Sequence, residues 1–264
     1  MAILELSDGK MLSFREDGSG PPLVLVHGSP GESGSWRRVT PFLKDRFRVL
    51  AVDLPGYGGS AKVTDDPVGR TALIGGLVAR LAESCGAPVR LVGHSFGGSV
   101  ALQAALQAQA GTIDRMVLFE PVFFRALELT DDPALGPGQT FFHDYSSRAL
   151  AGEDGVVRLM IDYWFGAGAY ARMPDPVRGY LNANARSNAI DVRSGFYESA
   201  TAAQLAAFDK PVLVACGDKS PEIVRDIGRG LLKLLPQARM EAIAGANHGM
   251  LDAHPEAVAR LIAA

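Results

Sequence analysis

Cysteine is scarce in this sequence, because the 264 residues contain only Cys85 and Cys216. Two such distant cysteines match neither the spacing of a zinc site nor the disulfide framework of a small secreted protein, so we interpret them as buried thiols. No apolar run approaches the roughly 18 residues of a membrane span. The first residues carry the acids Glu5 and Asp8 and do not have the pattern of a signal peptide. We therefore expect a soluble, cytoplasmic protein with no membrane partner.

An excess of one charge is also absent. The chain has 26 Lys and Arg residues against 29 Asp and Glu residues, a net charge of −3, with no basic or acidic tail. This balance argues against a nucleic-acid partner. The 47% of apolar residues excludes disorder for most of the chain. The length allows one large domain, or one domain with an insertion.

Short apolar segments are what the sequence does contain. Two of them, Ile3–Leu6 and Met11–Arg15, predict a hairpin around Asp8-Gly9. Six further runs lack alternation and suit strands buried on both faces, as in a parallel sheet. These runs are Leu23–Val26, Phe47–Val52, Val89–Val92, Met116–Phe119, Val212–Ala215 and Met240–Ile243. Helical patterns lie between or after them, at Trp36–Leu43, Thr71–Cys85, Phe96–Ala110, Glu222–Leu235 and Pro255–Ala264. The alternation predicts an α/β fold.

The alternation is interrupted once, between Pro121 and Lys210, where no buried strand is predicted. These ~90 residues are too many for a loop. We therefore predict a core formed by residues 1–121 and 207–264, with residues 122–206 inserted as a helical cap.

The strongest chemical signal is Gly-x-Ser-x-Gly at residues 93–97, between a predicted strand and a predicted helix. In that context the motif forms a sharp turn that projects the Ser95 hydroxyl from the sheet edge. Gly93 and Gly97 keep the turn free of Cβ atoms. Ser95 is therefore the predicted nucleophile.

A second motif, HGSP at residues 27–30, follows the strand Leu23–Val26. Together with the Ser95 motif and the loop DLPGYGGS at residues 53–60, it resembles the α/β-hydrolase fold family over the whole chain. The resemblance implies an eight-stranded, mostly parallel sheet flanked by helices, an inserted helical cap, and no metal or organic cofactor.

The same resemblance implies an oxyanion hole and a catalytic histidine. The backbone N–H groups of Ser29 and Phe96 would form the oxyanion hole. We interpret His27 as a structural histidine that braces the loop. The loop after the last predicted strand contains His248, which matches the catalytic histidine of the family and would act as general base.

The acid of the triad is less simple to assign. In most of the family it stands third after the glycine that follows the strand matched by Val212–Ala215. Here that segment reads GDKS, so Ser220 occupies the acid position and Asp218 comes two residues early. Glu120, in contrast, ends the apolar strand Met116–Phe119, where a carboxylate without a partner is costly to bury. Some haloalkane dehalogenases and epoxide hydrolases of the fold carry their acid at this strand. We predict Glu120 as the acid, with Asp218 as the alternative.

Serine with a histidine base suits acyl transfer, whereas epoxide hydrolases and dehalogenases use an aspartate nucleophile for displacement at carbon. The sequence therefore predicts a serine hydrolase that cleaves a carboxylic ester or related acyl bond of a small, partly apolar substrate through an acyl-enzyme. A C–C bond hydrolase of aromatic degradation, a perhydrolase, a lactonase and a ligand receptor stay open as alternatives. A homodimer is compatible with the sequence.

The predicted cap contributes side chains of two kinds. Its aromatic residues suit either the roof of an apolar pocket or the cap's own core. Five arginines are solvated by default, although one of them could bind a substrate carboxylate. They are Arg125, Arg158, Arg172, Arg186 and Arg193.

Overall fold

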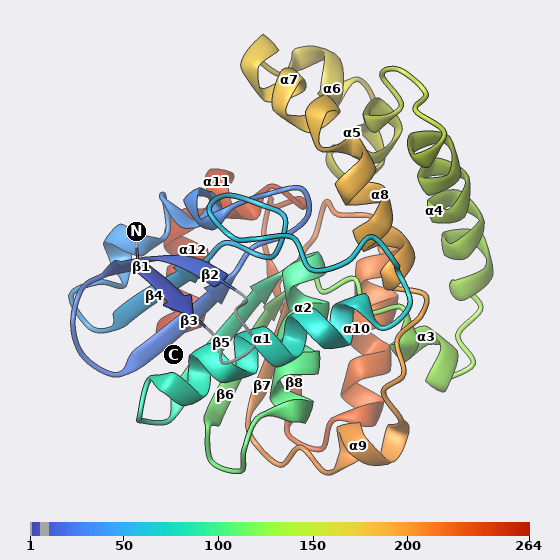
Figure 1. Ribbon diagram of the computed structural model, residues 1–264. Helices are drawn as coiled ribbons and strands as arrows, with labels where there is room; N and C mark the ends of the chain where they lie inside the picture. The colour runs from blue at the N-terminus through green and yellow to red at the C-terminus, as the bar shows by residue number, and fades with distance from the viewer. Residues whose placement is uncertain (1, 6–10) are drawn as a thin grey trace.

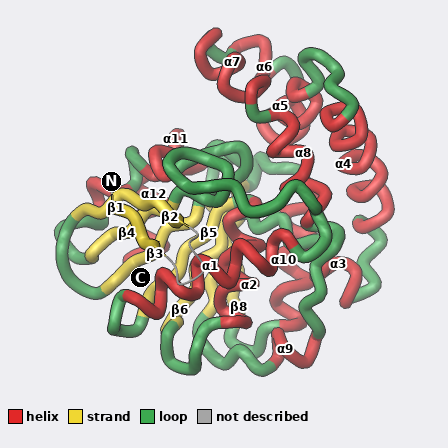
Figure 2. The backbone as a smooth tube through the Cα atoms, in the orientation of Figure 1, coloured by secondary structure: helices red, strands yellow, loops and turns green. Residues whose placement is uncertain are grey.

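The structure is a computed structural model that describes residues 2–5 and 11–264. An eight-stranded sheet forms its centre, in the order β1-β2-β4-β3-β5-β6-β7-β8 (Figures 1 and 2). The strands are β1 (Ala2–Glu5), β2 (Met11–Asp17), β3 (Pro22–Val26), β4 (Arg48–Val52), β5 (Val89–His94), β6 (Ile113–Phe119), β7 (Val212–Gly217) and β8 (Ala238–Ile243). Pairs β1–β2 and β2–β4 are antiparallel and the other pairs are parallel. The expected mostly parallel eight-stranded sheet is confirmed.

The predicted N-terminal hairpin agrees with the antiparallel pairing of β1 with β2. Its turn at Asp8-Gly9 lies outside the described residues.

The inner parallel strands are buried on both faces because successive side chains alternate between two cores. The edge strand β8 is not, so the burial on both faces expected for Met240–Ile243 is wrong: within β8 only Ile243 is buried. In β3, Val24 and Val26 join one core, whereas Leu23 and Leu25 join the other. The first core is covered by α1 (Arg70–Ser84), α2 (Phe96–Gln107) and α10 (Glu222–Leu234). The second is covered by α11 (Met250–Ala253), α12 (Pro255–Ala263) and the 3₁₀ helix η1 (Ser33–Trp36), together with Val39 and Leu43 on either side of a second 3₁₀ helix, η2 (Thr40–Phe42). This is why the sequence shows continuous apolar runs.

One predicted helix is wrong. Residues 36–43 form no α-helix: Trp36 ends η1, residues 40–42 form η2 with Pro41 inside it, and residues 37–39 and 43 are in turns. Proline has no N–H and its ring clashes with the preceding helical turn, so it interrupts the predicted helix. The apolar periodicity was nevertheless informative, because Trp36, Val39 and Leu43 are buried against the sheet.

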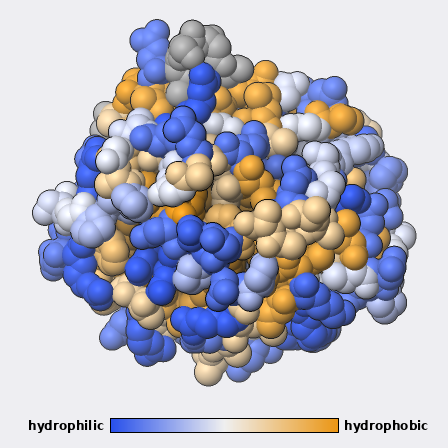
Figure 3. All heavy atoms as spheres, turned by 90° about the horizontal axis from the view of Figure 1, so that it is seen from below, coloured by the Kyte–Doolittle hydropathy of each residue, from blue (hydrophilic) through white to orange (hydrophobic). Residues whose placement is uncertain are grey.

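Seven helices lie between β6 and β7: α3 (Arg125–Leu129), α4 (Leu135–Leu150), α5 (Val157–Phe165), α6 (Ala169–Arg172), α7 (Asp175–Ala183), α8 (Ala185–Ser194) and α9 (Ala202–Ala206). Figure 1 shows α4 to α8 beyond the edge of the sheet at which Ser95 lies, whereas α3 and α9 lie beside α10. On the face turned away from α4–α8, hydrophilic and hydrophobic side chains are interspersed (Figure 3). Among the described residues, no helix has the length and apolar character that a membrane span needs.

Candidate active site

Ser95 stands in the turn between β5 and α2 with a positive φ of 56°. A side chain rarely adopts this backbone region, and such strain is found at functional turns. The two flanking glycines are needed for packing. A Cβ at Gly93 would come within 2.3 Å of the Gly97 carbonyl oxygen, and a Cβ at Gly97 within 2.4 Å of the His27 carbonyl oxygen. The turn thus presses α2 against the sheet and presents the Ser95 hydroxyl at the carboxyl edge.

Three predicted residues come together at this edge from three separate strand ends. His248 Nε2 lies 2.9 Å from Ser95 Oγ, and His248 Nδ1 lies 2.6 Å from Glu120 Oε2. All three side chains are buried. An imidazole that keeps its proton on Nδ1 donates to Glu120 and leaves Nε2 free to accept from the serine hydroxyl. This is the geometry that a general base requires.

Glu120 is completely buried immediately after β6. Its Oε1 accepts hydrogen bonds from the Gly217 N–H at 2.7 Å and from the Ser220 hydroxyl at 2.5 Å. Burial by itself raises the pKa of this carboxyl, but the hydrogen bonds and charge of His248, with Ser220 and Gly217, outweigh burial and leave the pKa below its ordinary value. The carboxylate form is therefore the one that this environment stabilises.

The alternative acid does not reach the histidine. Asp218 is exposed, and its Oδ1 accepts a hydrogen bond from the Gly245 N–H at 2.8 Å. It thereby joins the loop after β7 to the loop that leads to His248. Ser220, which occupies the position of the usual acid in the family, donates to Glu120 instead.

Two further histidines, the buried His27 and the half-buried His94, lie beside the site and contact backbone atoms. His27 Nε2 accepts from the Leu54 N–H at 2.9 Å, so its Nδ1 donates to the Gly28 carbonyl at 2.7 Å. Burial lowers the pKa of His27 to about 4 and that of His94 to about 3. His94 Nε2 lies 3.0 Å from the carbonyl oxygen of His248. Both rings therefore brace loops as neutral groups.

The loop that carries Ser29 is tied to α8 by buried polar contacts that the sequence analysis missed. Ser29 Oγ and the Tyr57 hydroxyl each donate to Asp191 Oδ2 at 2.6 Å, and Arg70 Nε donates to Asp191 Oδ1 at 2.8 Å. Asn188 Nδ2 donates to the Ser29 carbonyl at 2.9 Å. We call these five residues the junction cluster. The available sequence signal was two polar residues, Asn188 and Asp191, three positions apart on one helix face.

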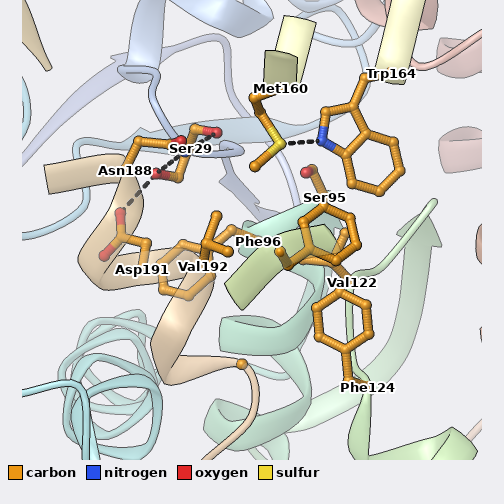
Figure 4. A pocket seen from close by; sticks show the side chains of 12 residues that line it. Ser29, Ser95, Phe96, Val122, Phe124, Met160, Trp164, Asn188, Asp191 and Val192 are labelled. Atoms are coloured by element: carbon orange, nitrogen blue, oxygen red, sulfur yellow. Dashed lines mark hydrogen bonds between the residues drawn. The ribbon is translucent and has the colours of Figure 1, made fainter. Parts of the chain in front are cut away.

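Two cavities reach Ser95. The inner one, about 30 Å³, includes Phe96, Val122 and Val192 in its wall (Figure 4). The outer one, about 280 Å³, is open to the surface and includes His248. Ser29, Ser95, Met160 and Trp164 border both cavities.

The aromatic residues of the predicted cap divide between the two roles expected of them. Phe124, Phe142 and Trp164 line the inner cavity, and Phe165 lines the outer one. The Trp164 ring also stacks on His248 with centroids 4.4 Å apart. Phe141 and Tyr163 instead stack on each other at 4.4 Å within the helical layer. Within the part of the chain that the structure describes, none of the five cap arginines lines either cavity at Ser95.

Comparison with known proteins identifies the family. The model of the Alpha/beta hydrolase family matches residues 23–261. The chain therefore belongs to that family, and this membership supports a hydrolase. It is 28% identical to a non-heme chloroperoxidase of Streptomyces lividans over 280 residues, 97% of this chain and 96% of that protein. It is also 38% identical to a pimeloyl-[acyl-carrier protein] methyl ester esterase of Methylococcus capsulatus, over 97 residues that make up 37% of this chain and 36% of that one.

A solved structure shows the same fold. The esterase of Exiguobacterium antarcticum superposes with a TM-score of 0.74 at 17% identity, covering 99% of both chains.

Proposed function

We propose that this protein is a carboxylic-ester hydrolase that acts through an acyl-enzyme on a small, partly apolar substrate. The observation that carries the proposal is the continuous hydrogen-bond chain from Ser95 through His248 to Glu120. The likeness to two proteins named as esterases supports it.

The first half of the reaction makes the acyl-enzyme. Ser95 Oγ attacks the ester carbonyl carbon while His248 Nε2 takes the hydroxyl proton, and Glu120 holds the resulting imidazolium. The negative oxygen accepts hydrogen bonds from the N–H groups of Ser29 and Phe96, of which the latter lies in the first turn of α2 and has no acceptor within the helix. The bond to the alcohol oxygen then breaks, and His248 returns the proton to that oxygen.

The second half regenerates the enzyme. A water molecule gives its proton to His248 and attacks the acyl carbon, and the Ser95 oxygen leaves with that proton. The products are one carboxylic acid and one alcohol. Loss of one oxyanion donor lowers kcat by a factor on the order of 10²–10³. This is the size of the contribution expected from each of the N–H groups of Ser29 and Phe96.

Covalent labelling tests the proposal. A fluorophosphonate probe should label one site in the wild-type protein, no site in Ser95→Ala, and one site in the matched surface variant Asp218→Asn. Persistent labelling of Ser95→Ala would show that the nucleophile is another residue.

Substrate tests then separate the alternatives. Turnover of p-nitrophenyl acetate or butanoate without cleavage of a vinylogous diketone supports the ester hydrolase over the C–C bond hydrolase. Saturable ligand binding with no turnover, and with equal affinity in Ser95→Ala, would instead indicate a receptor.

A further inference from the structure

The two cavities at Ser95 contain different parts of the reaction machinery. Phe96, which supplies one oxyanion N–H, lines only the inner cavity. His248, which supplies the proton to the leaving group, lines only the outer cavity. Figure 4 shows Ser95 directed into the inner cavity, between Trp164 and Val122.

This division fixes the direction in which an ester can bind, if the proposed function holds. The carbonyl oxygen must face the N–H groups of Ser29 and Phe96, and the alcohol oxygen must lie within reach of His248 Nε2 to receive its proton. The alcohol part therefore extends into the outer cavity, and the acyl chain must occupy the inner cavity.

The inner cavity is small, and the aromatic side chains in its wall are tightly packed against one another. A site for one water molecule needs roughly 10–15 Å³, so the volume of about 30 Å³ admits two or three atoms beyond the carbonyl carbon. Phe142 packs between Phe124 and Trp164, with ring centroids 5.1 Å and 5.5 Å away. Phe124 and Phe142 are almost completely buried. Rings packed in this way cannot swing aside for a longer chain without opening the core.

The polar side chains of the inner cavity are already engaged with the protein. Asp191 accepts from Ser29, Tyr57 and Arg70, while Asn188 donates to Ser29 and accepts from Tyr145. Among the described residues, no Lys or Arg borders this cavity. A carboxylate at the end of the acyl chain would thus meet Asp191 and find no countercharge, so the acyl group must be neutral.

The outer cavity has room for a larger and mainly apolar group. Its volume is about 280 Å³, and apolar side chains from α5 and α7 border it, such as Val157, Ile161 and Val177. Arg37 and Asp252 also border it, and they are paired with each other at 2.9 Å.

From these observations we infer the substrate class: an ester of a neutral acid of two to four carbons with a larger, mainly apolar alcohol. The inference rests on the proposed ester hydrolase function and deepens it. The ester can bind in only one direction. If its acyl and alcohol groups were exchanged, the long chain would have to enter the small inner cavity.

An isomeric pair of esters tests the direction. Hexyl acetate and methyl heptanoate have the same atoms and the same ester group, but they exchange the long and short sides. Since each misfitting methylene changes specificity by about tenfold or more, kcat/KM should be at least about 100-fold higher for hexyl acetate. Equal rates, or faster hydrolysis of methyl heptanoate, would overturn the inference while the ester hydrolase function stands. If neither isomer nor p-nitrophenyl acetate is hydrolysed although the fluorophosphonate still labels Ser95, both proposals fail.

Matched valine variants locate the limit on the acyl chain. Val192 borders only the inner cavity and Val177 only the outer one. Val192→Ala should raise the ratio of kcat/KM for p-nitrophenyl hexanoate to that for p-nitrophenyl acetate by about fivefold or more, and Val177→Ala should leave that ratio unchanged. Val122→Ala repeats the test at a second wall residue. An unchanged ratio in both inner variants, or an equal change in Val177→Ala, would show that the inner cavity does not select the acyl chain.

Discussion

Glu120 and Asp191 are both buried carboxylates near Ser95, but they come from different regions and have different partners. Glu120 follows a core strand and accepts from His248, a side chain that carries charge only while it holds an extra proton. Asp191 lies on α8 and accepts from Arg70, whose guanidinium stays charged in proteins. Glu120 can therefore take part in a reaction, whereas Asp191 stabilises the structure around it.

A third buried carboxylate, Glu198, completes this comparison because a neutral amide is its partner. Gln103 Nε2 donates to Glu198 Oε2. Burial raises the pKa of Glu198 to about 8, since the hydrogen bonds from Gln103 and Thr71 only partly offset the loss of water. The three buried acids are paired with an imidazole, a guanidinium and an amide, respectively. The role of the carboxylate charge therefore differs from one acid to the next.

The largest effect is expected from Glu120→Gln. The amide can still accept from Gly217 and Ser220, but its NH₂ group then faces His248 Nδ1 and favours the tautomer with the proton on Nε2. That tautomer cannot accept the Ser95 proton, so kcat for a short ester should fall on the order of 10³–10⁴-fold.

The free energy of unfolding of Glu120→Gln should change by only about 1 kcal/mol, because its backbone and hydroxyl contacts persist. Steady-state kinetics and urea titration of the same preparation measure both effects. A full loss of stability would mean that Glu120 serves the fold as Asp191 does.

The opposite pattern is expected for Asp191→Ala. Arg70 would stay buried without its countercharge, which should lower the free energy of unfolding by about 3–5 kcal/mol in urea titration. Because Ser29 loses an acceptor, kcat should also fall, by about tenfold. The double variant Arg70→Met with Asp191→Leu should recover most of the stability, since replacing a buried ion pair by apolar groups is often neutral. Failure to recover would show that the hydroxyl contacts of Asp191, not its charge, hold the junction cluster.

Glu198→Gln should alter the pH dependence of stability. The ordinary pKa of this carboxyl is 4.5 and its folded pKa is about 8, so between these values the folded state binds more protons than the unfolded state. The free energy of unfolding of the wild type should therefore fall as pH rises from 5 to 8, by roughly 3 kcal/mol from this group. Glu198→Gln should remove that fall while differing little from the wild type at pH 5. Parallel slopes in urea titrations would contradict the expected neutral form of Glu198.

These differences explain what could be predicted from the sequence. Alternation between two cores makes the strands visible as apolar runs, and residues that follow parallel strands gather at one edge of the sheet. Ser95, Glu120 and His248 could be proposed together for that reason, with the family resemblance to guide them. The structure brings all three into one hydrogen-bond chain.

The junction cluster could not be predicted in the same way. Asn188 and Asp191 meet Ser29 through the packing of α8 over the core, and their spacing fits an exposed helix face equally well. The same limit applies to cavity size, because the inner wall combines residues from four helices, α2, α4, α5 and α8, with the loop after β3, the turn before α2 and the segment after β6. Periodicity reports which residues are buried but not which distant segments they meet.

The smallest effects should separate Ser220 from Asp218, two residues of one loop. Ser220→Ala removes the hydroxyl that donates to Glu120 Oε1, so the pKa of Glu120 should rise toward its ordinary range and kcat should fall about three- to tenfold, more steeply at low pH. Asp218→Asn keeps an oxygen for the Gly245 N–H and should leave kcat within about twofold. Rate profiles from pH 4 to 8 test the pair. A dead Asp218→Asn beside an active Ser220→Ala would assign the acid to Asp218, in the loop after β7 that carries it in most of the family. The expected result would instead show that the hydroxyl of Ser220, at the usual acid position, supports an acid that follows the neighbouring strand β6.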